Sequence, residues 1–175
     1  MATTSDVSGQ NELYEQAASE YGAALARLAR GYEANEDKQR DLLQEIHVAL
    51  WRSLEGFNGL CSLRTWVYRV AHNSATSYVI RQRRARPEVL VGLEEAEPLP
   101  IEPDADRKVV LNQLTELIRH LKPVDRQVIL CWLDGMDAAE IGELTGLSSG
   151  NVATKVHRIK NILARGLQGV RNGRS

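Results

Sequence analysis

The sequence predicts an all-α protein, with two small helical domains joined by an acidic linker that contains prolines. In both halves of the 175-residue chain, apolar residues recur every three to four positions, which is the spacing of an amphipathic helix. The alternating pattern of strands is absent, and 87–106 carries seven acids, no base and four prolines. We therefore expect a flexible N-terminus at 1–11, a helical bundle at 12–86, a linker at 87–106, a second helical domain at 107–168 and a basic tail at 169–175.

The first domain is expected to contain three helical runs separated by two loops. Glycine and asparagine place the loops at residues 31–37 and 55–62. In the third run, Trp66 and Val70 are expected to pack in the core, because an aromatic residue beside aliphatic ones at helical spacing usually does so. The apolar residues that define the runs are Leu13, Ala17, Tyr21, Leu25 and Leu28, then Leu42, Leu43, Ile46 and Leu50, then Trp66, Val67, Val70 and Ala71.

The second domain is expected to contain four helices, the last two of which form a helix-turn-helix. We predict the first at about 106–121, where Lys122-Pro123 ends it, then a second with Val128, Ile129 and Trp132 as its apolar set. The third and fourth are predicted at about 137–144 and 149–167. Gly142 and Gly146 would allow the close helix crossing and the left-handed turn that the motif needs. Ser148 or Ser149 would cap the last helix through its side-chain oxygen. The shared core would contain Ile141, Leu147, Val152 and Val156.

Charge is segregated along the chain, although its net value is only −1. Six arginines and no acid lie between Ser62 and Arg86, and no acid follows Glu143. Two basic blocks of this kind favour a nucleic-acid partner, since lysine and arginine displace the counterions of phosphates. In the helix-turn-helix geometry, the start of the last helix enters the major groove. The residues expected near bases and phosphates are Ser149, Gly150, Asn151, Ala153, Thr154, Lys155 and Arg158; the alternative is a surface helix with solvated cations.

Other functional classes have little support in the sequence. There is no phosphate-binding glycine loop, no metal-ligand spacing and no catalytic constellation around the four histidines, so we expect no enzyme, no cofactor and no metal. Cys61 and Cys131 are expected to be reduced thiols, because their spacing fits neither a zinc site nor a disulfide scaffold. No apolar run is long enough for a membrane span, so we expect a cytoplasmic protein without membrane insertion.

Several segments together resemble the sigma-70 family, specifically the extracytoplasmic-function (ECF) group of RNA polymerase sigma factors. Asp41–Trp51 resembles the region 2.2 pattern, and Phe57–Asn73 resembles region 2.3 with its entry loop. The second half resembles region 4 and follows in the expected order. The residues that match the region 4 pattern are Leu121, Pro123, Arg126, Val128, Ile129, Glu140, Ile141, Gly146, Gly150, Val152 and Arg158.

The resemblance implies that the protein confers promoter specificity on core RNA polymerase. Region 2.2 implies docking on the clamp helices of the largest subunit, through Asp41, Leu42, Gln44, Glu45 and Val48. Four of these residues, all except Leu42, are spaced to share one helix face. Region 4 implies recognition of the minus-thirty-five element and contact with the flap of the second-largest subunit. An anti-sigma factor is a further partner implied by the family.

Region 2.3 implies recognition and melting of the minus-ten element. Opening DNA without ATP requires a pocket for an unstacked base and arginines that hold the separated strand. The residues expected to contact this DNA are Phe57, Asn58, Leu60, Ser62, Arg64, Thr65, Tyr68, Arg69, His72, Asn73, Arg81, Arg83 and Arg84.

Two alternatives stay open at this point. The acidic linker suits a basic polymerase channel that accommodates RNA, but it is equally well a soluble spacer. The chain as a whole could also be a conventional helix-turn-helix regulator whose N-terminal helices sense a ligand or dimerise. Such a regulator would bind naked duplex DNA as a symmetric dimer, whereas a sigma factor acts together with polymerase.

Overall fold

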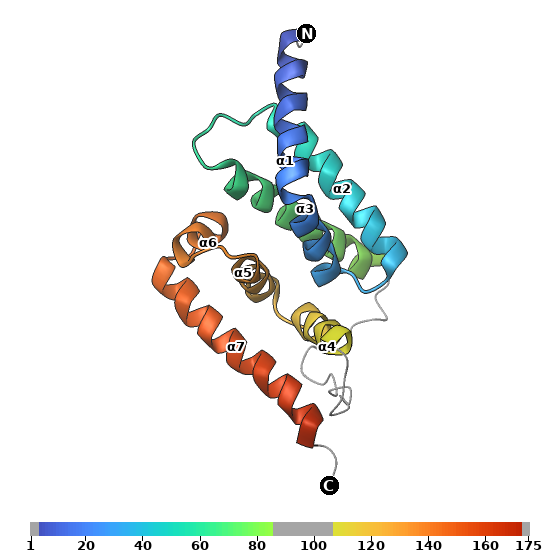
Figure 1. Cartoon of the computed structure of the whole chain (residues 1–175), viewed down its shortest axis with the longest axis vertical. Coiled ribbons are helices and arrows are strands. Elements are labelled where there is room, and N and C mark those ends of the chain that lie inside the picture. Colours follow the sequence, from blue (N-terminus) through green and yellow to red (C-terminus); the bar gives the residue numbers. More distant parts are fainter. Residues whose placement is uncertain (1–3, 86–106, 173–175) are drawn as a thin grey trace. The chain divides into compact units, whose positions relative to one another are not determined.

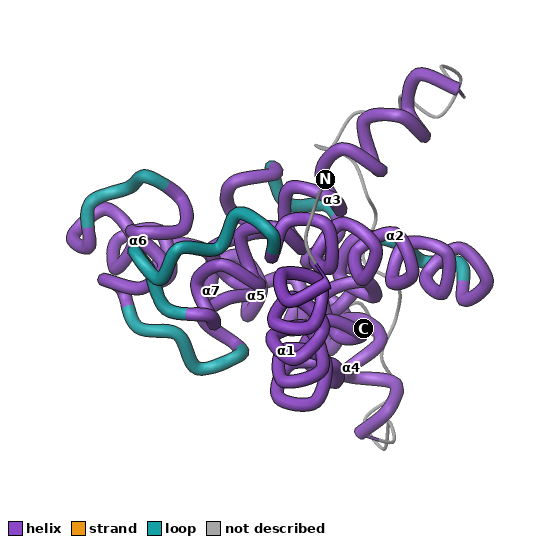
Figure 2. Tube along the Cα trace, turned by 90° about the horizontal axis from the view of Figure 1, so that it is seen from above, coloured by secondary structure: helices purple, strands orange, loops and turns teal. Residues whose placement is uncertain are grey.

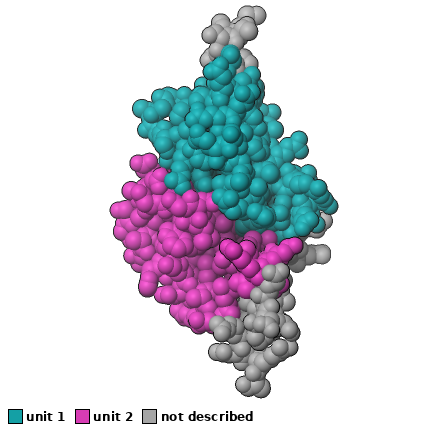
Figure 3. All heavy atoms as spheres, in the orientation of Figure 1, with its two compact units in different colours: residues 1–85 teal, residues 86–175 magenta. Residues whose placement is uncertain are grey.

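The computed structural model describes residues 4–85 and 107–172, and over these residues it is helical, with no strand (Figures 1 and 2). The chain divides into two compact units, residues 1–85 and 86–175, which are coloured separately in Figure 3. The predicted all-α fold is confirmed. The helices are α1 (Thr4–Tyr32), α2 (Glu36–Leu54), α3 (Leu63–Ala85), α4 (Arg107–Arg119), α5 (Pro123–Leu133), α6 (Ala138–Thr145) and α7 (Ser149–Asn172).

The first unit is a bundle in which α1, α2 and α3 each pack against the other two (Figure 1). Its core is aliphatic, and the side chains of Leu25, Leu42, Ile46 and Leu50 are fully buried. These residues recur at three- and four-residue intervals, so each helix buries one face. The two loops lie within the ranges where glycine and asparagine predict them, and Asn35 caps α2 by accepting a hydrogen bond from the Lys38 N–H at 3.1 Å.

Helix α1 begins earlier than the sequence pattern predicts. The helix starts at Thr4, within the segment expected to be flexible. Its first half is held by contacts with α2: Gln10 Nε2 donates to the Trp51 carbonyl at 2.6 Å, and Trp51 Nε1 donates to Asn11 Oδ1 at 2.9 Å. The Tyr14 hydroxyl lies 3.0 Å from His47 Nδ1. These contacts are polar, so hydrophobic periodicity does not reveal them. Helix α7 likewise extends to Asn172, into the predicted basic tail.

One polar pair lies inside the first unit. The Tyr32 hydroxyl is 2.8 Å from His72 Nδ1, and the His72 side chain is almost fully buried. The rings of Tyr32 and Tyr68 flank the imidazole, with centroids 5.8 and 6.4 Å away. Burial lowers the pKa of His72 to about 3, because the apolar surroundings disfavour the charged form. His72 is therefore neutral at physiological pH.

The second unit is built around α7, which packs against α4, α5 and α6. Val128, Ile129, Ile141, Val152 and Ile159 form its buried core. Pro123 opens α5, where its missing N–H costs nothing. The buried guanidinium of Arg126 donates to the carbonyl oxygens of Arg119 and Leu121, which lie at and just after the end of α4. This arginine satisfies carbonyl groups that the helix itself leaves open.

Candidate nucleic-acid interface

The turn between α6 and α7 depends on two glycines. A Cβ atom on Gly142 would lie only 2.7 Å from the carbonyl oxygen of Leu147, so α6 and the turn approach more closely than any other residue allows. Gly146 has a φ of 77°, in the left-handed region, and its N–H donates to the Gly142 carbonyl at 2.8 Å. Both predicted roles of these glycines are confirmed. The geometry is that of a helix-turn-helix with α6 first and α7 second.

Side-chain caps fix the start of both helices of the motif. Asp137 accepts hydrogen bonds from the N–H groups of Ala139 and Glu140, while Glu140 accepts from the Asp137 N–H, which completes a capping box. Ser148 Oγ accepts from the Asn151 N–H at 3.3 Å. Of the two serines considered as the cap of α7, Ser148 is therefore the one that caps it.

We expect Asp137→Ala to lower the free energy of unfolding of the second unit by about 1 kcal/mol, because two N–H groups of α6 lose their acceptor. Urea denaturation would measure the change. Asp137→Ser is the matched control, since serine retains an accepting oxygen and should keep most of the stability. An equal loss in both variants would contradict the assigned role of the cap.

The start of α7 presents an exposed, acid-free surface. Ser149, Gly150, Asn151, Thr154 and Arg158 are exposed. The opposite face of the helix enters the core through Val152, Val156 and Ile159. Of the remaining residues predicted to contact DNA here, Ala153 is exposed and Lys155 is half-buried. The helix therefore has one side free for a ligand and one side fixed to the unit.

A carboxylate that the sequence analysis did not single out lies beneath this surface. Asp125, in the first turn of α5, is buried and accepts hydrogen bonds from Lys155 Nζ at 2.8 Å and from the Arg158 guanidinium at 2.6 Å. The phase of α5 is the sequence signal that indicates its inward position. Asp125 lies three and four residues before the core residues Val128 and Ile129, so the carboxylate must point inward. A buried acid of this kind needs cations, and α7 supplies them.

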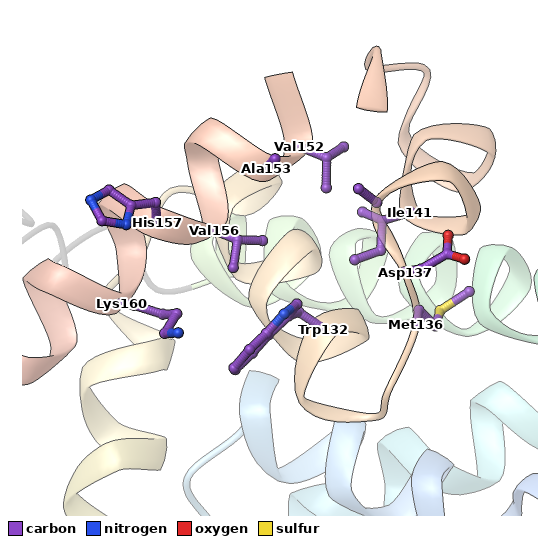
Figure 4. A pocket seen from close by; sticks show the side chains of 10 residues that line it. Trp132, Met136, Asp137, Ile141, Val152, Ala153, Val156, His157 and Lys160 are labelled. Atoms are coloured by element: carbon purple, nitrogen blue, oxygen red, sulfur yellow. The ribbon is translucent and has the colours of Figure 1, made fainter. Parts of the chain in front are cut away.

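An apolar groove lies between α5, α6 and α7 (Figure 4). It has a volume of about 290 Å³, and Trp132, Met136 and Val156 line it. The Lys160 ammonium lies 4.8 Å from the centre of the Trp132 ring, at cation–π distance. Ala153, predicted to face DNA, also lines this groove, so it lies at the edge of the recognition surface rather than at its centre.

In the first unit, α2 presents an acidic face. Asp41, Gln44, Glu45 and Val48 are all exposed, as the three- and four-residue spacing predicts. Glu45 also pairs with Arg81 of α3 at 2.5 Å, with both side chains exposed. Leu42, which was grouped with these residues, has no exposed surface and belongs to the core. Leu42 therefore supports the face from behind and is not available to a partner in this fold.

The residues predicted to contact the minus-ten element fall into three groups by exposure. Thr65, Tyr68 and His72 are buried, because they follow the inward phase of α3 together with Val67 and Ala71. This differs from the predicted DNA-facing position. The half-buried residues are Phe57, Arg64 and Arg69; the exposed residues are Asn58, Leu60, Ser62, Asn73, Arg81, Arg83 and Arg84.

Side-chain hydrogen bonds hold the loop before α3. Ser62 Oγ accepts from the Thr65 N–H at 3.1 Å and so caps α3, and Asn58 Oδ1 accepts from the Leu60 N–H at 3.1 Å. Leu60 projects from this loop with 88% of its surface exposed. The Phe57 ring packs edge-on against Trp66, with centroids 5.4 Å apart. Trp66 and Val70 are half-buried, so they lie at the margin of the core in which they were predicted.

Other kinds of site are not evident in the described parts of the chain. Residues 4–85 and 107–172 contain no cluster of histidine, cysteine or acidic side chains that could hold a metal ion. The histidines contact tyrosine, asparagine or glutamate side chains or backbone carbonyls instead. Among the described helices, none has the length and apolar character needed to cross a membrane. The linker hypothesis concerns residues outside the described ranges.

Comparison with known proteins identifies both halves of the chain. Residues 17–85 match the family model for sigma-70 region 2, and residues 111–163 match that for sigma-70 region 4. The ECF RNA polymerase sigma-E factor of Haemophilus influenzae is 26% identical over 171 residues, which cover 91% of this chain and 90% of that protein. The chain belongs to the ECF group of the sigma-70 family. A second relative of this sigma factor, the RNA polymerase sigma factor CnrH of Cupriavidus metallidurans, is 28% identical over 87% of this chain and 85% of that protein.

Solved structures show the same fold as this sigma factor. The sigma factor RpoE of Bartonella quintana, in complex with the anti-sigma factor NepR, superposes with a TM-score of 0.68 at 20% identity, covering 89% of this chain and 96% of that one. CnrH in complex with the cytosolic domain of CnrY superposes with a TM-score of 0.64 at 23% identity, covering 98% and 95% of the two chains. At these identities the likeness concerns the fold.

Proposed function

We propose that this sigma factor binds core RNA polymerase and directs promoter-specific initiation, with the first unit opening the minus-ten element and the second reading the minus-thirty-five element. The observation that carries the proposal is the presence, in one chain, of an exposed acidic face on α2 and an exposed, acid-free recognition helix α7. The family supplies the context in which both surfaces have a role. Catalysis belongs to the polymerase.

The α2 face is the proposed polymerase contact. Asp41 and Glu45 offer carboxylates, Gln44 lies between them, and Val48 follows Glu45 on the same exposed stripe. A basic helical partner such as the clamp helices of the largest subunit fits this stripe, because opposite charges steer the encounter and the apolar Val48 side chain is available for burial. The flap of the second-largest subunit is the expected partner of the second unit.

The proposed minus-ten surface comprises the loop before α3 and the exposed side of α3. Leu60 and the partly exposed Phe57 ring offer apolar surface on which an unstacked base can rest. Asn58 and Asn73 are exposed polar groups for a base edge, and Arg83 and Arg84 are exposed cations for the strand. Thr65, Tyr68 and His72 are not part of this proposed surface, because they hold α3 against the core.

The proposed minus-thirty-five surface is the start of α7. The side chains of Asn151 and Thr154 are exposed there, and Gly150 lets DNA approach the backbone closely. Asn151 can bond the edge of a base, while the N–H groups at the helix start favour phosphate. The groove beside Trp132 is proposed to remain outside the DNA contact.

We also propose two features that follow from the family context. A cytoplasmic anti-sigma factor is an expected partner, since both structural relatives described above are sigma factors solved with a bound partner, NepR in one case and CnrY in the other. The protein is proposed to act in the cytoplasm without catalytic activity of its own.

Co-elution with bacterial core RNA polymerase tests the proposal directly. We expect the wild-type chain to bind with one-to-one stoichiometry and to produce run-off transcripts from particular genomic promoter fragments. Asp41→Arg/Gln44→Ala is expected to weaken binding by at least ~30-fold, about 2 kcal/mol, since a reversed charge in the proposed interface both removes an attraction and adds a repulsion. Transcripts should disappear in parallel.

The matched control places the same kinds of change on α1. Glu12→Arg/Gln16→Ala alters two exposed residues that precede the matched region 2, and it should leave polymerase binding unchanged. Equal loss in both double variants would show a nonspecific charge effect. Absence of polymerase binding by the wild-type chain, together with tight dimeric binding to a palindromic duplex, would instead favour a conventional helix-turn-helix regulator.

A further inference from the structure

The buried carboxylate of Asp125 engages two cations of the recognition helix at once. Oδ1 accepts from Lys155 Nζ at 2.8 Å, and Oδ2 accepts from the Arg158 guanidinium at 2.6 Å. Only 8% of the Asp125 side chain is exposed, whereas 30% of Lys155 and 55% of Arg158 are. Because each oxygen binds a different cation, the three side chains hold one another in place.

This arrangement changes what the two cations can offer to DNA. A lysine on a recognition helix ordinarily extends toward phosphate, and each phosphate that it neutralises steepens the dependence of binding on salt. Here the Lys155 ammonium points back to α5 and is bound to a carboxylate. Arg158 is exposed by more than half and has five N–H donors, so it can bond Asp125 with one nitrogen and still present others outward.

We propose that Asp125 is a specificity-setting positioning residue of the minus-thirty-five surface. It withholds Lys155 from phosphate and fixes the direction of Arg158, so that nonspecific affinity is lowered while sequence-dependent contacts are retained. The inference rests on the proposed role of α7 in reading DNA. Asp125 itself does not contact DNA, because it is buried beneath the helix.

The test is the salt dependence of DNA binding by Asp125→Asn. Loss of the carboxylate charge frees Lys155, and one additional phosphate contact should steepen the slope of log K against log salt by about 0.9. At low salt, affinity for a duplex of scrambled sequence should rise roughly three- to tenfold, and the ratio of specific to scrambled binding should fall. Asp125→Glu retains the charge and should keep the wild-type slope.

A double-mutant comparison separates this mechanism from a general charge effect. Lys155→Ala should change binding to scrambled duplex by less than about twofold in the wild-type background, and by the full three- to tenfold in the Asp125→Asn background. Arg165→Ala, an exposed cation later on α7, should have the same effect in both backgrounds. Equal effects of Lys155→Ala in the two backgrounds would overturn the proposal.

Two precautions keep the outcomes distinct. If Asp125→Asn does not fold, Lys155→Met in the wild-type background still tests the proposal. A slope of log K against log salt that falls by about 0.9 in this variant would show that Lys155 already contacts phosphate, and it would overturn the proposal. The titrations use the full chain, both free on a scrambled duplex and as holoenzyme on a promoter found by run-off transcription. If the predicted salt slopes are observed but no promoter-specific transcript forms, only the proposed function is refuted. If neither the free chain nor the holoenzyme binds any duplex, both proposals are refuted.

Discussion

Gly142→Val is expected to destabilise the second unit by about 2–3 kcal/mol. The added Cβ would lie 2.7 Å from the Leu147 carbonyl oxygen, which is a backbone atom and can move only if the turn moves. The small gain in helix propensity from replacing glycine does not offset this overlap. Since stability of a whole domain is only about 5–15 kcal/mol, α6 and α7 should open often enough to impair DNA binding.

Hydrogen exchange measured by mass spectrometry can locate this effect. Exchange should accelerate across α6 and α7 and stay unchanged in α1, α2 and α3, because Gly142 and the atoms that its Cβ would meet all belong to the second unit. Gly22→Val in α1 is the matched control: a Cβ there meets nothing within 4 Å, so its stability should remain close to that of the wild type. Comparable destabilisation by both valines would show that the close approach at Gly142 is not the cause.

Acidification from pH 7 to pH 5 is expected to reduce the stability of the first unit by about 2 kcal/mol through His72. Burial lowers the pKa of His72 from 6.5 to about 3 in the folded protein, so below pH 6.5 the unfolded chain binds a proton that the folded chain does not. The stability contribution is therefore complete above pH 6.5 and is lost as pH falls from there toward 3.

Urea denaturation at pH 7, 6 and 5 measures this dependence. His72→Gln should remove most of the dependence of the free energy of unfolding on pH, whatever effect the substitution has on stability at pH 7. A smaller loss of stability on acidification should persist in this variant, because burial also lowers the pKa of His47. His157→Gln, at an exposed position on α7, should leave the slope unchanged. A His72→Gln variant with the full wild-type pH dependence would show that the buried imidazole is not responsible.

Much of the fold could be predicted from the sequence, because the hydrophobic periodicity and the turn residues match the way the helices pack. Helical periodicity indicates the buried faces of α1 and α2, and the Lys122-Pro123 pair correctly marks the boundary between α4 and α5. Gly142 and Gly146 were predictable because a close helix approach and a left-handed helix end both favour glycine on steric grounds. The start of α1 was not predictable in this way, since Gln10 and Asn11 are ordered by polar contacts with a residue about 40 positions away.

The candidate site was predictable in its location but not in its detail. A motif places its residues along a helix, whereas the phase of the helix decides which of them face outward. Tyr68 and His72 fall on the inward phase of α3, and Leu42 on that of α2. Asp125 illustrates the converse case. The phase of α5 indicates that its carboxylate points inward, but no local pattern shows that its partners, Lys155 and Arg158, lie thirty or more residues away on α7.

The hydrogen bonds at the start of α1 determine how far the protein can be truncated from its N-terminus. The match to sigma-70 region 2 begins at residue 17, yet Gln10, Asn11 and Tyr14 contact Trp51 and His47 of α2. Trp51 follows Val48 by one turn and adjoins the proposed polymerase-binding face. A shortened protein that began at the family boundary would leave the Trp51 indole uncovered beside that face, inviting self-association where polymerase should bind. The folding unit is thus longer than its recognisable motif.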